Sequence, residues 1–279
     1  MKKLKGLTFV GERALFFGRD LEIVDCIFEE GESPLKESEN IQLKNCGFKW
    51  KYPVWYSKNV ALENCEFYET ARSGVWYTED ITFDKCLIAA PKTFRRAKNI
   101  TLKNVDMPNA WETLWSCDGV KLECVKAVGD YFGMNCKNIE ASNFALDGNY
   151  CFDGGENIVV KDSVLNSKDS FWNVKKAYVE NTTIIGEYIG WNSEDVTFKN
   201  CTIESLQGFC YMKNLKLIDC VLKNTTLAFE YSTVEADIDY CDSIKNPSGG
   251  VIVTGDVGEL IMESDKIDPS KTKIIIKKR

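Results

Sequence analysis

The chain has 279 residues, of which 35 are basic and 42 acidic, and its formal net charge at pH 7 is −7. This balance argues against nonspecific binding to nucleic acid or to anionic membranes, because both need a positively charged surface. The sequence contains no histidine, which excludes Ser-His-Asp triads, Cys-His pairs and His-ligated zinc or iron.

The N-terminal segment, residues 1–14, starts like a secretory signal, with three lysines before a short apolar stretch. Glu12 and Arg13 end that stretch too early for the apolar region of a signal peptide. No segment has the roughly eighteen consecutive apolar residues that a membrane span needs. We therefore expect a cytoplasmic protein without a membrane partner, in which the cysteines stay reduced.

A nine-residue phrase returns along residues 15–245. Asn40–Phe48 and Asn59–Phe67 share the pattern Asn, apolar, variable, apolar, polar, Asn, Cys, variable, Phe. The first apolar residue of each copy serves as an anchor, and successive anchors are 19 to 21 residues apart. The anchors are Leu21, Ile41, Val60, Ile81, Ile100, Val120, Ile139, Ile158, Ala177, Val196, Leu215 and Val234.

Within each copy, apolar residues alternate with polar ones, which is typical of strands. The anchor and the residue two later are apolar, and so are the residues five and seven later. The alternation slips by one between these pairs, which predicts a sharp bend. The residue at the slip, four after the anchor, is Asn or Asp in nine of eleven copies, and a second Asn/Asp column directly precedes the anchors. Asn and Asp tolerate the left-handed conformation, so we expect two corners per coil.

The C-terminal segment, residues 246–279, leaves this period. Three apolar runs, at 251–253, 260–262 and 274–276, are predicted to form strands of a terminal cap. The last residues are rich in positive charge, which we interpret as a solvated end. These basic residues are Lys271, Lys273, Lys277, Lys278 and Arg279.

An all-strand coil with tight corners predicts stacked parallel strands around a common core. The predicted fold is all-β: a single-stranded right-handed parallel β-helix of about twelve coils of 19–21 residues, with caps at both ends. We expect one domain, with an N-terminal cap at 1–14, coils at 15–245 and a C-terminal cap at 246–279. A leucine-rich repeat is the nearest rival, but its leucine spacing differs.

The coil phrase and the Asn columns resemble the pectate-lyase-like right-handed parallel β-helix superfamily across residues 15–245. The chain length and the cysteine-bearing phrase also look like an uncharacterised bacterial family of about 280 residues, described as domain of unknown function 3737. This resemblance implies a β-helix and supplies no activity.

Cysteines form a column five residues after the anchors: Cys26, Cys46, Cys65, Cys86, Cys201 and Cys220. A linear ladder cannot place four sulfurs at the corners of a tetrahedron without bending the coils. We interpret the column as small inward-facing core residues, and we expect no metal and no cofactor.

An aromatic band precedes the anchors by five and four residues. Five of the seven tryptophans share the first of these columns. Outward rings could bind a carbohydrate, whereas the small residues two positions later fit an inward-facing core layer. Both orientations stay open. The candidate ligand-binding residues are Trp55, Tyr56, Trp76, Tyr77, Arg96, Trp115, Asp130, Trp172 and Trp191.

Enzymes of this fold hydrolyse polysaccharides with clustered carboxylates and a histidine, or cleave them with an Arg or Lys base. This chain has no Asp-Asp pair and no histidine. Asp130 and Glu187 are three coils apart, about 14 Å, which is too far for a glycosidase pair. The candidate catalytic residues are therefore Asp153, in the loop-like segment 147–155, and Arg95.

Two functions follow from these patterns. We favour a noncatalytic binding or scaffold β-helix with a carbohydrate or protein ligand on the aromatic face. The alternative is a carbohydrate-active lyase or hydrolase that uses Arg and Asp/Glu without histidine. We expect no nucleic-acid partner. A left-handed β-helix acyltransferase does not fit, because its repeat is six residues.

Overall fold

The computed structural model describes residues 1–277. The chain consists of two compact units, Met1–Ala145 and Leu146–Arg279, and each is described by itself. Lys278 and Arg279, two of the basic residues of the predicted solvated end, lie outside the described residues. Within residues 1–277 there is no helix of the length and apolarity that a membrane span requires.

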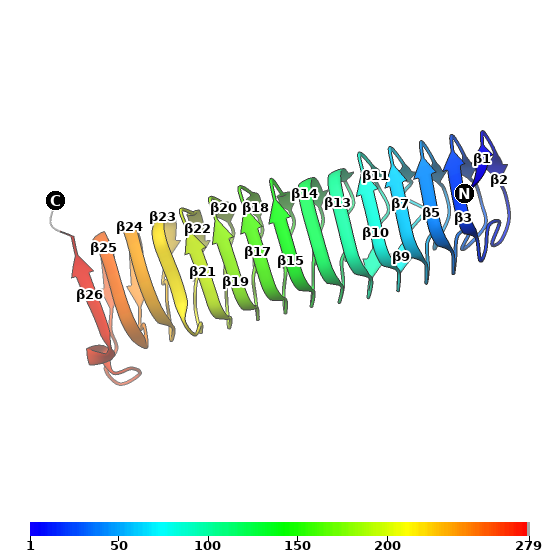
Figure 1. The fold of residues 1–279 in the computed structure, drawn as a ribbon. Coiled ribbons are helices and arrows are strands. Elements are labelled where there is room, and N and C mark those ends of the chain that lie inside the picture. Colours follow the sequence, from blue (N-terminus) through cyan, green and yellow to red (C-terminus); the bar gives the residue numbers. More distant parts are fainter. Residues whose placement is uncertain (278–279) are drawn as a thin grey trace. The chain divides into compact units, whose positions relative to one another are not determined.

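The first unit consists of short parallel strands, and equivalent strands of successive coils lie side by side (Figure 1). Its strands are β1 (Lys2–Lys5), β2 (Thr8–Phe9), β3 (Arg19–Val24), β4 (Ile27–Phe28), β5 (Glu39–Lys44), β6 (Gly47–Phe48), β7 (Lys58–Glu63), β8 (Glu66–Phe67), β9 (Val75–Trp76), β10 (Glu79–Asp84), β11 (Leu87–Ile88), β12 (Phe94–Arg95), β13 (Lys98–Met107), β14 (Asp118–Val128) and β15 (Lys137–Ser142).

The second unit repeats this arrangement and adds one short 3-10 helix. After β16 (Ala145–Asp147), which includes the division between the units, its elements are β17 (Glu156–Lys161), β18 (Val164–Asn166), β19 (Lys175–Glu180), β20 (Thr183–Ile185), β21 (Glu194–Lys199), β22 (Thr202–Leu206), β23 (Leu215–Thr226), β24 (Thr233–Lys245), β25 (Gly249–Ile261), η1 (Pro269–Lys271) and β26 (Thr272–Ile276).

The strand register confirms the predicted repeat. Leu21 pairs with Ile41 and Ile41 with Val60, and Ala177 pairs with Val196 in the second unit. Anchors therefore lie over anchors in successive coils. The fold is the predicted right-handed parallel β-helix.

Both predicted corner columns have left-handed backbone. All eleven residues at the slip position have φ between 50° and 55°, and Lys85 and Cys124 are among them. Their amides also form ladders: Asn64 Nδ2 donates to Asn45 Oδ1 at 2.8 Å, and Asn45 Nδ2 donates to Asp25 Oδ1 at 2.8 Å. The corners are therefore fixed by both backbone preference and inter-coil hydrogen bonds.

A second kind of ladder lies inside the coils. The Ser38 backbone N–H donates to Ser57 Oγ, and the Ser57 N–H donates to Thr78 Oγ1. In a later coil, the Cys117 N–H donates to Cys136 Sγ at 3.2 Å. Small hydroxyl and thiol side chains thus satisfy buried backbone groups that the corners remove from the strand ladder.

Aromatic side chains stack along the interior. Phe28 and Phe48 are 4.6 Å apart with rings 3° from parallel, and Phe48 contacts Phe67 in the next coil. The predicted cysteine column is also interior, since Cys26, Cys46, Cys65 and Cys86 are all buried. All twelve cysteines are free thiols.

Both ends of the chain continue the stack. Lys2 pairs with Leu21, so β1 keeps the 19-residue step in a segment where the sequence pattern predicts a break. At the other end, Val234 pairs with Gly250 and Gly250 with Thr272, steps of 16 and 22 residues. Because these steps differ from the 19–21 residues of the other coils, the repeat cannot be recognised in this part of the sequence.

Candidate functional site

The tryptophan column faces outward in both units. In the first unit, Trp55 is half-buried, whereas its neighbours Val54 and Ser57 are buried. Trp76, Trp115, Trp172 and Trp191 have the same intermediate exposure. The core-layer interpretation of this column is therefore wrong, and the small residues two positions later are the ones that face inward.

In the first unit these rings form a continuous stack with one arginine inside it. Trp55 and Trp76 have ring centroids 5.1 Å apart and planes 7° from parallel. The Arg95 guanidinium lies 4.6 Å from the ring centroids of both Trp76 and Trp115. Each neighbour therefore covers a ring face, and the rings present mainly their edges to solvent.

The indole N–H groups hold the rings in place. Trp76 Nε1 donates to the Lys92 backbone oxygen at 2.9 Å, and Trp115 Nε1 donates to the Tyr131 oxygen at 2.8 Å. Trp55 Nε1 donates to the Ser73 backbone oxygen. Because each bond reaches the next coil, the aromatic surface is rigid before any ligand arrives.

Tyrosines form a parallel column beside the tryptophans. Tyr56 and Tyr77 stack at 4.8 Å with planes 6° from parallel, and Tyr56 is 50% exposed. Arg96 follows in the next coil, where its backbone N–H donates to the Trp115 oxygen. Tyr56, Tyr77 and Arg96 all have positive φ, which turns their side chains outward at a further corner.

The outward band also includes residues that sequence analysis missed. Phe16 and Phe17 lie five and four residues before Leu21, and both are exposed. Tyr52 packs on Trp55 at 4.5 Å, and Lys36 lies over the Tyr56 ring. Counting back from the first two anchors, as for the later ones, would have found Phe16, Phe17 and Lys36.

Positive charge gathers on three of these coils. We define the basic aromatic stripe as segments 51–56, 72–77 and 91–96, which contain no Asp or Glu. Lys92 and Arg95 pair with Glu112, at 3.1 and 3.5 Å. The other basic residues are Lys51, which pairs with Glu32 at 3.4 Å, and the exposed Arg72 and Arg96. Within residues 1–277, no ion pair is made by either of these two arginines.

In the second unit the equivalent band is acidic. Asp153 Oδ1 accepts a hydrogen bond from Asn173 Nδ2 at 3.1 Å, and Asn173 Oδ1 accepts one from Asn192 Nδ2 at 2.8 Å. The predicted catalytic carboxylate is thus part of an amide ladder. Trp172 stacks against Tyr150 in the same unit.

One carboxyl group of this band is nearly inaccessible. Asp169 is 4% exposed. Burial raises the pKa of Asp169, and the nearby charges of Glu187 and Asp153 act in the same direction, while Lys168 opposes them. Lys168 Nζ itself pairs with Glu187 at 2.9 Å. The Asp169 carboxyl therefore holds its proton at higher pH than an ordinary aspartate.

The two predicted catalytic residues lie in different units. Arg95 belongs to the first unit, where two indole rings and Glu112 surround its guanidinium, and Asp153 belongs to the second. Asp130 is half-buried, and its backbone oxygen accepts from the Glu112 N–H at 3.0 Å. Among residues 1–277, no group of three or more Cys, Asp or Glu side chains is placed to hold a metal ion.

Comparison with known proteins gives one family. The model of the family described as "Protein of unknown function (DUF3737)" matches residues 2–275. A search of curated proteins gives no match.

Several solved structures are similar in fold. PfbA, a surface adhesin of Streptococcus pneumoniae, is 11% identical over 89% of this chain and 70% of its own, with a TM-score of 0.35. The A-module of the Azotobacter vinelandii mannuronan C-5 epimerase AlgE4 is 9% identical over 99% and 88%, with a TM-score of 0.34. A mutant tailspike protein of E. coli bacteriophage HK620, in complex with a pentasaccharide, is 10% identical over 92% and 62%, with a TM-score of 0.41. TM-scores this low support no conclusion about the function of this chain.

Proposed function

We propose that this chain, which belongs to the DUF3737 family of proteins of unknown function, is a noncatalytic binding β-helix for an extended, negatively charged carbohydrate. Membership of the family assigns no activity, so the proposal rests on the basic aromatic stripe. The observation that carries this proposal is the charge of the stripe. Its three segments contain five basic side chains and no acidic ones, in a protein whose net charge is −7. Lys51, Lys92 and Arg95 pair with glutamates outside the segments, so among residues 1–277 the exposed Arg72 and Arg96 are the ones without an ion pair. A local reversal of charge on an acidic protein favours a negatively charged ligand.

The side chains of the stripe suit a polar ligand better than an apolar one. The indole faces are covered by Trp76, Arg95 and their neighbours, so stacking of sugar rings on those faces is not available. What remains is a rigid row of ring edges, the Tyr56 and Tyr77 side chains and the guanidinium groups of Arg72 and Arg96. Arginine pairs with carboxylate or sulfate groups through two parallel hydrogen bonds.

The spacing of the stripe favours a polysaccharide over a peptide. Equivalent side chains recur once per coil, about 4.8 Å apart along the stack. An extended peptide presents every second side chain on one face, at about 6.6 Å, and does not match that repeat. A linear polysaccharide carries its charged groups on a regular repeat, and the rigid stripe loses little entropy on binding it.

The test compares polygalacturonate with its fully methyl-esterified form, which removes the charge and keeps the backbone. Binding is measured by calorimetry and by tryptophan fluorescence at low and high salt. We expect binding of the charged polymer that weakens with salt. The double variant Arg72→Gln/Arg96→Gln should bind about 10-fold more weakly, since two exposed charge contacts contribute together about 1.4 kcal/mol.

The matched control is Lys121→Gln/Lys126→Gln, which removes two exposed charges from β14, outside the stripe. It should leave the affinity unchanged. Equal binding of the esterified polymer would contradict the charge argument. Absence of binding to any polysaccharide, with binding of an acidic protein instead, would replace the proposal with a protein ligand.

The enzymatic alternative has one specific observation in its favour. Asp169 is a buried carboxyl group with a raised pKa, as a general acid requires, and Asp153 and Trp172 belong to the same band. On incubation with polygalacturonate or its methyl-esterified form, an enzyme would release reducing or unsaturated ends, and a binding protein would release none.

A further inference from the structure

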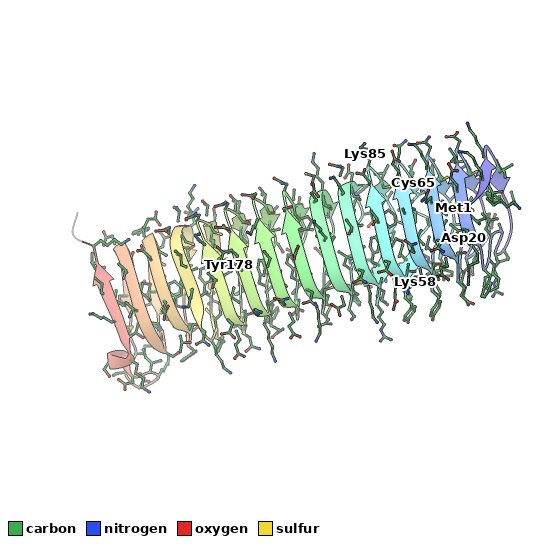
Figure 2. The ribbon with its side chains drawn as sticks, in the orientation of Figure 1. Met1, Asp20, Lys58, Cys65, Lys85 and Tyr178 are labelled. Carbon is green, nitrogen blue, oxygen red and sulfur yellow. The ribbon has the colours of Figure 1, made fainter. Side chains whose placement is uncertain are left out.

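The last strand of the second unit has one open edge. β26 pairs with Gly250–Thr254 of β25, and among residues 1–277 no strand lies on its other side (Figure 2). The Lys277 N–H donates to the Thr254 backbone oxygen at 2.8 Å. The backbone groups of successive residues in a strand point alternately to its two sides, so the N–H groups of Ile274 and Ile276 face the open edge. This edge therefore offers hydrogen bonds to a further strand.

The hydrophobic core of this unit is also uncovered at this end. Leu260 pairs in register with the buried Ile244, and Ile276 pairs with the buried Thr254. Paired residues of parallel strands point to the same side of the sheet, so Leu260 and Ile276 point toward the core. Each is nevertheless 49% exposed, because β26 pairs with only the first part of β25. A solenoid needs a cover over such an end.

We propose that the open edge of β26 binds the same edge of a second copy of this chain, antiparallel, and so forms a dimer with two-fold symmetry. The two copies then share one continuous sheet, and their uncovered core ends face each other. The dimer is closed, because the pairing uses the same strand of both copies and leaves no second site. It does not depend on the basic aromatic stripe, which belongs to the first unit.

Charge excludes the other open edge, that of β1, as the partner. β26 contains Lys273 and is followed by Lys277, whereas β1 contains Lys2, Lys3 and Lys5. Neither strand contains an acidic residue. Pairing of β26 with β1 of another copy would therefore bring five lysines together, and like charges on adjacent strands are destabilising.

Antiparallel pairing of two β26 strands brings opposite charges together instead. The segment before β26 contains Asp265 and Asp268, which are exposed and make no ion pair within residues 1–277. Asp268 caps η1, which directly precedes β26. Because the end of one β26 lies beside the beginning of the other, Lys277 comes close to Asp268 of the second copy. Lys277 also pairs with Asp237 of its own copy and stays exposed. This complementarity favours the antiparallel dimer.

The sequence of β26 also favours one register. When Ile274 lies opposite its own copy, Lys273 lies opposite Ile275 and Thr272 opposite Ile276. Ile274 then exchanges two backbone hydrogen bonds with its counterpart, as its edge-facing groups allow. A register centred on Ile275 would place Lys273 opposite Lys277, which is a repulsive pair. We therefore place the two-fold axis at Ile274.

The first test measures the mass of the full-length protein in solution by light scattering. We expect twice the mass of one chain, constant over the micromolar range. Ile275→Lys places a lysine opposite Lys273 at two symmetric positions, and it should raise the dissociation constant of the dimer at least 10-fold. Ile276→Pro removes an N–H group that faces the open edge and should have the same effect.

The matched control is Ile218→Lys, the same change at a residue of similar exposure, 39% against 36% for Ile275. Ile218 belongs to β23, which pairs with β21 and β24, so this variant should remain a dimer. A wild-type mass of one chain, a mass that rises with concentration, or an Ile275→Lys variant that stays as dimeric as the control would overturn the proposal.

The second test identifies the partner strand. Two residues that exchange both backbone hydrogen bonds across an antiparallel pair have Cα atoms about 5.5 Å apart, a distance that a disulfide can bridge. Ile274→Cys, in a Cys124→Ser background that removes the exposed thiol, should therefore form a covalent dimer on mild oxidation. Ile218→Cys in the same background should form none. Absence of the Ile274→Cys dimer, or equal crosslinking of both variants, would contradict self-pairing of β26.

Discussion

At the scale of single residues, conformation was predictable where the residue type signals it. Asn and Asp mark the corners beside the anchors, and those positions have positive φ. The corner at Tyr56, Tyr77 and Arg96 has the same left-handed backbone, but Tyr and Arg carry no such signal. Each of these left-handed conformations costs roughly 1–2 kcal/mol of folding free energy. Inter-coil hydrogen bonds offset this cost, such as the one from the Tyr56 N–H to the Trp76 backbone oxygen at 3.0 Å. The outward orientation of the aromatic band therefore could not be read from the sequence.

Removal of a single hydroxyl group tests the interior ladder. Ser57 Oγ accepts from the Ser38 N–H at 3.2 Å and donates to the Leu35 oxygen at 2.7 Å. Ser57→Ala leaves both buried backbone groups without this partner, and we expect a loss of about 2 kcal/mol in the free energy of unfolding, measured by urea denaturation. Ser57→Thr is the control and should cost much less, because Thr78 fills the next position of the column. Equal losses in both variants would mean that packing, and not the hydroxyl, matters.

At the scale of strands, charge is organised in a way that single residues do not reveal. The residue two before each anchor alternates in sign within each unit: Arg19, Glu39, Lys58, Glu79, Lys98, Asp118 and Lys137 in the first, and Glu156, Lys175, Glu194 and Lys213 in the second. The register places each beside opposite charges, as for Glu79 with Lys58 and Lys98. A coil that paired one step too far would meet a like charge. The alternation thus favours the correct order of coils.

Reversal of one charge tests this alternation. Lys98 Nζ lies 3.5 Å from a Glu79 carboxylate oxygen, and Lys98 pairs in register with Asp118 on its other side. Lys98→Glu places three acidic side chains in a row, and we expect a destabilisation of about 1 kcal/mol at low salt. Lys98→Gln, which removes the attraction without adding repulsion, should cost less. At high salt the two variants should have similar free energies of unfolding, and a difference that persists there would point to packing rather than charge.

At the scale of the whole molecule, the fold was predictable from the periodicity, because apolar anchors repeated at nearly constant steps are compatible with few other folds. Function did not follow in the same way. The stripe depends on Arg72, Lys92 and Arg96 lying on one face, which cannot be recognised until the outward and inward positions are known. The β-helix therefore supports several chemistries, and the surface columns distinguish them.

The first coil also protects an edge of the sheet. β1 pairs with β3 along one side, and its other side has no strand partner among residues 1–277. Three of its four residues are lysines, and all three are exposed. Lysines on an edge strand oppose pairing with the edge of another molecule, because like charges would be brought together.

Neutral side chains at this edge should permit association. Lys2→Thr/Lys5→Thr keeps the Lys3–Glu22 ion pair and raises the strand propensity. We expect the mass measured by light scattering to rise with protein concentration, while the wild type keeps a constant mass. The control is Lys121→Thr/Lys126→Thr, the same change in β14, which pairs with β13 and β15 on its two sides. Association of the control to the same extent would show that lost net charge, and not the open edge, is responsible.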